Sequence, residues 1–91
     1  HAVLSHEQLR RGGITQTSVD MRLAFKRALA LQAVAMILAH NHPSGHPRPS
    51  QSDHSLTKKF EKAGKNLDIR LLDHLIITEN TYFSFADEGQ L

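Results

Sequence analysis

The stretch AVAMILAHNHPSGHPRPSQSD, residues 33–53, decides the fold. It begins with a continuous apolar run at residues 33–39, which is typical of a buried strand covered on both faces. His40 and His42 follow at the end of that run. Residues 40–49 contain three prolines. Because each proline removes a backbone donor and disfavours helix in the residue before it, this segment is predicted to be a loop.

A helix is predicted directly after the loop, over residues 51–66. Its apolar positions recur at helical spacing and mark one stripe, formed by Leu56, Phe60, Ala63 and Leu67. Ser50 stands immediately before this helix, and Asp53 follows three positions later. The pair has the pattern of a capping box, with Asp in place of Glu.

The flanking segments add a second helix and several strands. Residues 20–31 separate polar and apolar positions at helical spacing, which predicts an amphipathic helix packed on a sheet. Short β-compatible runs at residues 2–4 and 14–17 are separated by Gly12 and Gly13, where positive φ has no steric cost, and predict a hairpin. In the second half of the chain, the runs predicted as strands are residues 69–72, 75–78 and 82–85.

Together these elements predict one domain over residues 1–91, an α/β or α+β sandwich with a central mixed β-sheet flanked by two helices. A composition of 40% hydrophobic and 22% charged residues is that of a soluble globular chain. The 11 basic and 9 acidic residues leave a net charge of +2, which does not indicate nucleic-acid binding. Since the chain begins with His1 rather than Met, we expect a fragment whose N-terminal part is missing.

Cysteine is absent, which excludes disulfides and thiolate metal sites and favours a cytoplasmic location. The longest apolar stretch, residues 28–39, is interrupted by Gln32 and is far shorter than the ~20 residues that cross a bilayer. No membrane segment is therefore expected.

The two histidines and the aspartate predict a metal site. If extended geometry persists, His40 and His42 project from the same face of the strand end. The loop can fold the first turn of the next helix back over that end, which brings Asp53 to them. Three protein ligands leave one position open, and zinc held in this way binds water there and lowers its pKa from about 15.7 to about 7. The pattern indicates a hydrolytic site.

A hydrolytic site also needs a proton acceptor and a group that stabilises negative charge. Ser50, or the amides at the start of its helix, would lie where charge develops on an attacked carbonyl oxygen. Spacing alone does not choose the proton acceptor among the remaining carboxylates, which are Glu7, Asp20, Glu61, Asp68, Asp73, Glu79, Asp87 and Glu88.

The same residues resemble a known family. His40, His42, Ser50 and Asp53 match the His-x-His-x7-Ser-x2-Asp signature of the JAMM (JAB/MPN) metalloprotease fold, which is similar to the cytidine deaminase fold. Three further stretches resemble its bacterial RadC branch, namely KRAL at residues 26–29, ILAHNHPSG at 37–45 and LDHLII at 72–77. The resemblance covers nearly the whole chain.

The resemblance implies a zinc ion on His40, His42 and Asp53, with Ser50 stabilising the tetrahedral intermediate. It also implies Glu7 as general acid/base, because residues 7–12, EQLRRG, align with the RadC pattern Glu-x-Leu-Phe-x-Gly. Two departures concern the entrance to the site. Arg10 replaces the family's aromatic residue, and residues 21–23, Met-Arg-Leu, replace its Pro-Arg-Glu helix start.

Other polar residues have simpler interpretations. A histidine in an apolar strand is more often held by structural hydrogen bonds, so His74 is left out of the catalytic set, with a contact to the site as the alternative. His46 and His54 are expected at the surface. An Asp53 carboxylate turned toward a metal is not expected to bond back to the Ser50 amide as well.

Two further functional classes stay open beside a metallopeptidase. The His-Asn-His triplet and the RadC family's association with DNA repair suggest a DNA-processing enzyme, and a binding module without activity is the third class. Four lysines recur along the helix after the loop (Lys58, Lys59, Lys62 and Lys65), but Glu61 interrupts them and favours a solvated face. The predicted partners are a peptide or isopeptide substrate and, through the missing segments, DNA or a DNA-repair complex; no membrane partner is expected.

Overall fold

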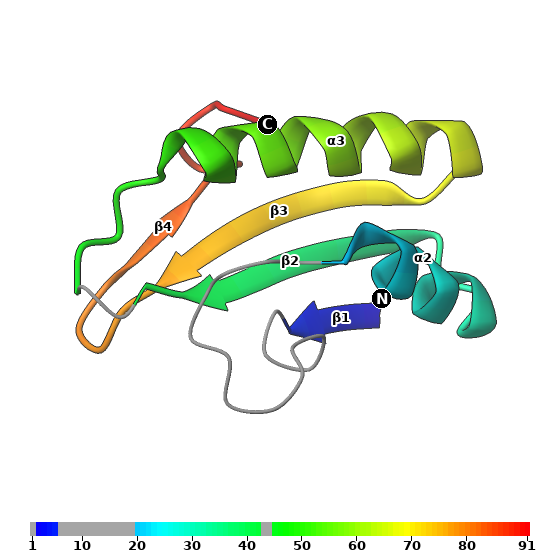
Figure 1. Cartoon of the computed structure of the whole chain (residues 1–91), viewed down its shortest axis with the longest axis horizontal. Helices are drawn as coiled ribbons and strands as arrows, with labels where there is room; N and C mark the ends of the chain where they lie inside the picture. Colours follow the sequence, from blue (N-terminus) through cyan, green and yellow to red (C-terminus); the bar gives the residue numbers. More distant parts are fainter. Residues whose placement is uncertain (1, 6–19, 43–44) are drawn as a thin grey trace.

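The described part of the chain folds as a mixed four-stranded sheet with two helices (Figure 1). The computed structural model describes residues 2–5, 20–42 and 45–91. The strands lie in the order β1-β2-β3-β4; β2 is parallel to β1 and β3, and β4 is antiparallel to β3. Their bounds are β1 (Ala2–Ser5), β2 (Ala35–Asn41), β3 (Arg70–Ile77) and β4 (Tyr82–Ser84). The predicted α+β fold class is confirmed. The predicted partner of β1 in a hairpin, residues 14–17, lies outside the described residues.

The two predicted helices are present with bounds close to those expected. They are α2 (Met21–Ala30) and α3 (Gln51–Leu67). Asp20 begins α2 by accepting a hydrogen bond from the Arg22 backbone N–H at 3.0 Å. Ser50 begins α3 in the same way, because its Oγ accepts from the Asp53 backbone N–H at 3.1 Å. The helix ends at Asp68, which takes the left-handed conformation with φ 57°.

Both helices pack on the same face of the sheet. Phe25 of α2 stacks on Phe60 of α3 with ring centroids 5.4 Å apart, and both belong to one core cluster. That cluster includes Met36 and Leu38, which are two residues apart on β2 and so share one face. Successive crossovers that step the same way along a sheet place their helices on one face. The opposite face of β2 is only partly buried at Ile37, so complete burial of both faces, as predicted, is not observed.

One extra residue changes the direction of side chains along β3. Met36 and Ile37 are adjacent on β2, but their partners on β3 are Leu71 and Asp73, so Leu72 is inserted between them. Side chains alternate along a strand, and the insertion therefore places His74 on the same face as Leu71. Both side chains are buried. The predicted pair of strands at residues 69–72 and 75–78 is in fact this single strand.

The buried side of α3 is polar at one end and apolar at the other. Asp53 and Thr57 occupy its first two turns, while Phe60 and Gly64 follow on the same side. Gly64 permits close packing, because a Cβ atom there would overlap the backbone carbonyl oxygen of Ile69. Figure 1 shows α3 running along β3, with its N-terminal end toward the carboxyl ends of β2 and β3. The fold thus places Asp53 at the strand ends.

Neither helix in the described part of the chain has both the length and the apolar composition needed to cross a membrane. The cytoplasmic location remains a prediction.

Candidate metal centre

His40 and His42 lie at the carboxyl end of β2. The strand continues two residues beyond its predicted end, since Asn41 still pairs with Ile77 of β3. The His42 backbone N–H then donates to the Ile77 carbonyl at 3.0 Å, which keeps the chain extended. The two imidazole rings are therefore neighbours, with centroids 5.0 Å apart, as predicted. His40 is buried, and the His42 side chain is 15% exposed.

Asp53 reaches both histidines from the first turn of α3. Its Oδ1 lies 3.1 Å from His40 Nε2, and its Oδ2 lies 3.1 Å from His42 Nε2. One ligand atom from each of the three side chains lies within 4.8 Å of the others. Of the residues that the structure describes, these three form a group able to hold a metal ion, which confirms that the predicted ligands converge.

The capping box at Ser50 coexists with this contact. The Ser50 backbone N–H donates to Asp53 Oδ2 at 2.7 Å, while Ser50 Oγ accepts from the Asp53 N–H. The expectation that a carboxylate facing the metal position would give up the Ser50 amide is therefore wrong. A carboxylate has two oxygens and about four lone-pair sites, so one oxygen can accept from Ser50 while both face the histidines.

The environment of Asp53 keeps it ionised. Burial on its own raises the pKa of this carboxyl, but the adjacent His40 ring and the hydrogen bonds with Ser50 outweigh burial and hold the pKa well below the ordinary value of 3.8. The buried aspartate thus supplies a full negative charge next to two imidazole rings.

The orientation of His42 fits a cation between these groups. Its Nδ1 lies 3.0 Å from the His46 carbonyl oxygen, which can only accept a hydrogen bond. The proton of the neutral ring therefore sits on Nδ1 and leaves a lone pair on Nε2, directed at Asp53 Oδ2. Two acceptors 3.1 Å apart repel unless a cation lies with them. Two imidazole nitrogens and one carboxylate are also a donor set that zinc takes in catalytic sites.

The predicted proton acceptor, Glu7, lies outside the described residues. β1 ends at Ser5, which pairs with Ala39, the residue before His40, and Glu7 follows Ser5 by two positions in the sequence. Among the described carboxylates, Asp53 alone joins the metal group. Asp73 has a different role, described below.

Three further histidines in the described part of the chain occupy different environments. His46 is exposed, as expected, and contributes its backbone carbonyl to His42. His54 is half-buried rather than at the open surface, because its ring packs edge-on against Phe85 with centroids 5.3 Å apart. His74 is fully buried, and its Nε2 lies 3.0 Å from His40 Nδ1. His74 therefore makes both structural hydrogen bonds and the contact to the site that the sequence analysis kept as the alternative, and its inward direction depends on the extra residue in β3.

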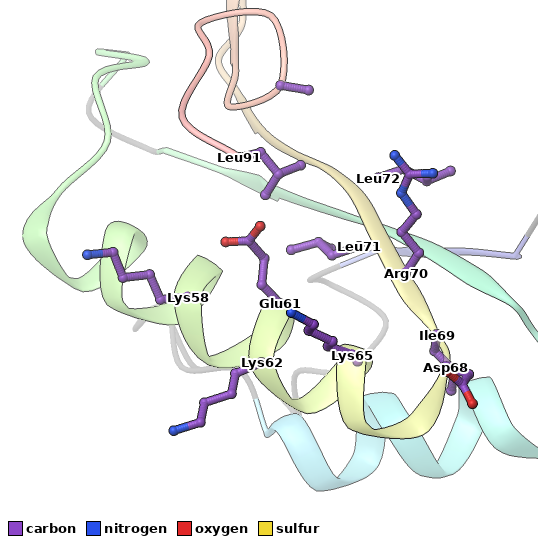
Figure 2. A pocket seen from close by; sticks show the side chains of 12 residues that line it. Lys58, Glu61, Lys62, Lys65, Asp68, Ile69, Arg70, Leu71, Leu72 and Leu91 are labelled. Atoms are coloured by element: carbon purple, nitrogen blue, oxygen red, sulfur yellow. The ribbon is translucent and has the colours of Figure 1, made fainter.

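A hollow of about 870 Å³ lies away from the metal centre, along α3 and β3 (Figure 2). Lys58, Lys62 and Lys65 line it together with Glu61 and Asp68. Figure 2 shows the Glu61 carboxylate among these side chains, near Leu91. Charges of both signs therefore share this surface, in line with the interpretation of the lysines as a solvated face.

The fold and the site together define a class of protein. It is an α+β domain in which a His-x-His pair ends a parallel strand and the next helix returns an aspartate to it, the arrangement expected for a JAB-type metal domain. The family model described as "RadC-like JAB domain" matches residues 1–90. The chain belongs to this RadC-like family.

Several curated relatives are similar over nearly the whole chain. A protein named UPF0758 from Flavobacterium johnsoniae is 56% identical over 87 residues, which are 96% of this chain and 38% of that relative. Proteins of the same name from Porphyromonas gingivalis and Thiobacillus denitrificans are 53% and 55% identical, and each alignment covers 98% of this chain and 40% of the relative. The chain thus spans about two fifths of the length of these relatives.

Proposed function

We propose that this domain is a zinc-dependent hydrolase of peptide or isopeptide bonds. The observation that carries the proposal is the convergence of His40 Nε2, His42 Nε2 and the Asp53 carboxylate at the carboxyl end of β2, where the His42 side chain is 15% exposed. We assign these three side chains as the zinc ligands. When bound, a zinc ion supplies a Lewis acid that makes water nucleophilic at neutral pH.

Ser50 is the proposed stabiliser of the tetrahedral intermediate. Its Oγ accepts from the Asp53 N–H and its backbone N–H donates to Asp53, but the hydroxyl hydrogen is used in neither bond. Ser50 is exposed next to the buried Asp53, so a substrate carbonyl oxygen can reach it. The positive end of the α3 dipole lies at the same place and favours negative charge there.

Glu7 is the proposed general acid/base. The support is the position of β1, whose Ser5 pairs with Ala39 beside the ligand strand. β1 is parallel to β2 and runs toward the same edge of the sheet as the ligands, and this direction supports the choice of a carboxylate that follows β1 in the sequence as the group that takes a proton from water. The assignment also follows from the family resemblance.

The proposed substrate class rests on the resemblance to the JAMM metalloproteases. Peptide and isopeptide bonds are therefore proposed as a class, and segments beyond this domain are expected to set the choice of substrate.

Metal content and turnover test the proposal. The protein is purified without chelator, its metal content is measured by mass spectrometry, and hydrolysis is followed with peptide and isopeptide libraries. We expect one zinc per chain, and loss of both metal and turnover in the double variant His40→Ala, His42→Ala. His46→Ala is the matched control, because it removes an imidazole beside the site but keeps the carbonyl that contacts His42.

Two results would contradict the proposal. A native protein without stoichiometric divalent metal, whose metal uptake is unchanged in the double histidine variant, would refute the metal site. A zinc-loaded protein that cleaves DNA in a Glu7-dependent manner and no peptide would instead identify a DNA-processing enzyme.

A further inference from the structure

His74 is a buried polar residue that the proposed hydrolysis does not use. Its ring is fully buried, and each of its nitrogens lies within hydrogen-bond distance of one buried side chain. Nε2 is 3.0 Å from His40 Nδ1, and Nδ1 is 2.6 Å from Thr57 Oγ1. Thr57 in turn contacts the backbone carbonyl of Asp53. These contacts join two of the proposed zinc ligands by a second route.

The backbone carbonyl of Asp53, which ends this series of contacts, sets the direction of the hydrogen bonds. A carbonyl oxygen only accepts, so the Thr57 hydroxyl donates its one hydrogen to Asp53 O at 2.9 Å. Thr57 Oγ1 is then an acceptor toward His74, which places the proton of the neutral His74 ring on Nδ1. His74 Nε2 is left as an acceptor, and His40 Nδ1 donates to it.

We propose that His74 and Thr57 are positioning residues that hold His40 with its proton on Nδ1 and its Nε2 lone pair directed at the metal position. The inference deepens the proposed function and rests on it. His42 needs no such side chain, because the His46 carbonyl performs the same task. Partners of this kind fix the tautomer and the ring orientation of metal-binding histidines.

The surroundings of His74 keep its ring in one orientation. Phe85 stacks on it with ring centroids 4.7 Å apart and an interplanar angle of 6°. Asp73 accepts from the His74 backbone N–H at 2.7 Å, and from the Ala86 N–H and the Ser84 hydroxyl at 2.9 and 2.6 Å. Asp73 therefore fastens β3 to the segment that carries Phe85. His74 Nε2 is therefore held in a fixed position to accept a hydrogen bond from His40 Nδ1.

The first test reads the tautomers directly. Long-range proton–nitrogen NMR of the ¹⁵N-labelled, zinc-loaded protein distinguishes a protonated from an unprotonated nitrogen in each ring. We expect His74 as the neutral Nδ1–H form and His40 with its proton on Nδ1. A His74 ring protonated on Nε2, alone or together with Nδ1, overturns the inference.

The second test measures zinc affinity by competition with a chromophoric chelator. We expect His74→Leu to weaken zinc binding roughly 10- to 100-fold. His74→Gln should recover most of that loss, because its amide oxygen can accept from His40. Thr57→Val should weaken binding and Thr57→Ser should not. Ile76→Val, which shortens a fully buried neighbour on β3 without touching a hydrogen bond, controls for general loosening of the core.

The outcomes separate this inference from the function on which it rests. If the native protein takes up no zinc, the proposed function fails and the inference fails with it. If the native protein binds zinc and His74→Leu, Thr57→Val and Ile76→Val all bind it equally well, only the inference fails. If His74→Leu does not fold, the zinc affinities of Thr57→Val and Thr57→Ser and the NMR measurement on the native protein still test the inference.

Discussion

Asp53→Asn separates the two roles that the structure assigns to this residue. In the native protein the carboxylate accepts from the Ser50 amide and faces both histidines. An asparagine keeps an oxygen for Ser50 and turns its NH₂ toward His40 Nε2, which presents a lone pair in the proposed tautomer. The helix cap is therefore preserved, while the anionic zinc ligand is lost.

The magnitudes of the two effects differ enough to be measured. Without zinc, the variant loses only the charge-assisted part of its hydrogen bonds, about 1–2 kcal/mol of unfolding free energy. With free zinc at about 100 times the Kd, binding adds about 2.7 kcal/mol to the native protein. A gain of that size raises the Tm of a domain of this length by about 10 to 20 °C. We expect this rise in the native protein and not in Asp53→Asn.

The assay is thermal unfolding with zinc and with chelator, and Ser50→Ala is the control. That variant loses the N-cap hydroxyl, about 1 kcal/mol, but keeps all three ligands, so its zinc-dependent rise in Tm should equal that of the native protein. The reasoning is refuted if Asp53→Asn shows a zinc-dependent rise as large as the native one, or if Ser50→Ala abolishes it.

Three further predictions concern stability, each measured by urea unfolding. Gly64→Ala should cost about 1–3 kcal/mol, because the added methyl group overlaps the Ile69 carbonyl; unchanged stability would show that the helix end shifts freely. Asp73→Ala should cost at least about 2 kcal/mol, since it removes the acceptor of three hydrogen bonds, including that of Ser84, and a loss below about 0.5 kcal/mol would contradict this. In chelator, the lowered pKa of Asp53 means that its contribution to the free energy of unfolding is present above the ordinary carboxyl pKa and is lost as the pH falls below that value. The native protein should therefore lose more stability than Asp53→Asn between about pH 5 and pH 2. Parallel plots of stability against pH for the two proteins would argue against the lowered pKa.

Local patterns in the sequence were sufficient to predict the elements that carry the proposed metal ligands. The apolar run before His40, the prolines after it and the cap at Ser50 each act within a few residues, so strand, loop and helix could be predicted together. The convergence of Asp53 on the histidines followed, because a short loop joins the two elements.

Long-range contacts account for what was missed. Asp73 and His74 interrupt an apolar run, and the local pattern therefore indicated two strands where one exists. The groups that satisfy these polar side chains are distant in sequence: Ser84 is 11 residues from Asp73, and His40 is 34 residues from His74. The double use of Asp53 was missed for a different reason: spacing in the sequence does not show that one carboxylate oxygen can accept from the Ser50 amide and still face His42.

The extra residue in β3 gives this strand room to lose a residue without reversing the side chains that follow. Deleting Leu72 would restore regular alternation from Leu71 onward, with Asp73 still opposite Ile37 and His74 still opposite Leu38 on the inward face. A homologous domain without the extra residue could therefore keep the same contact between His74 and His40. Such a domain would carry the aspartate–histidine pair one position earlier relative to the start of the strand.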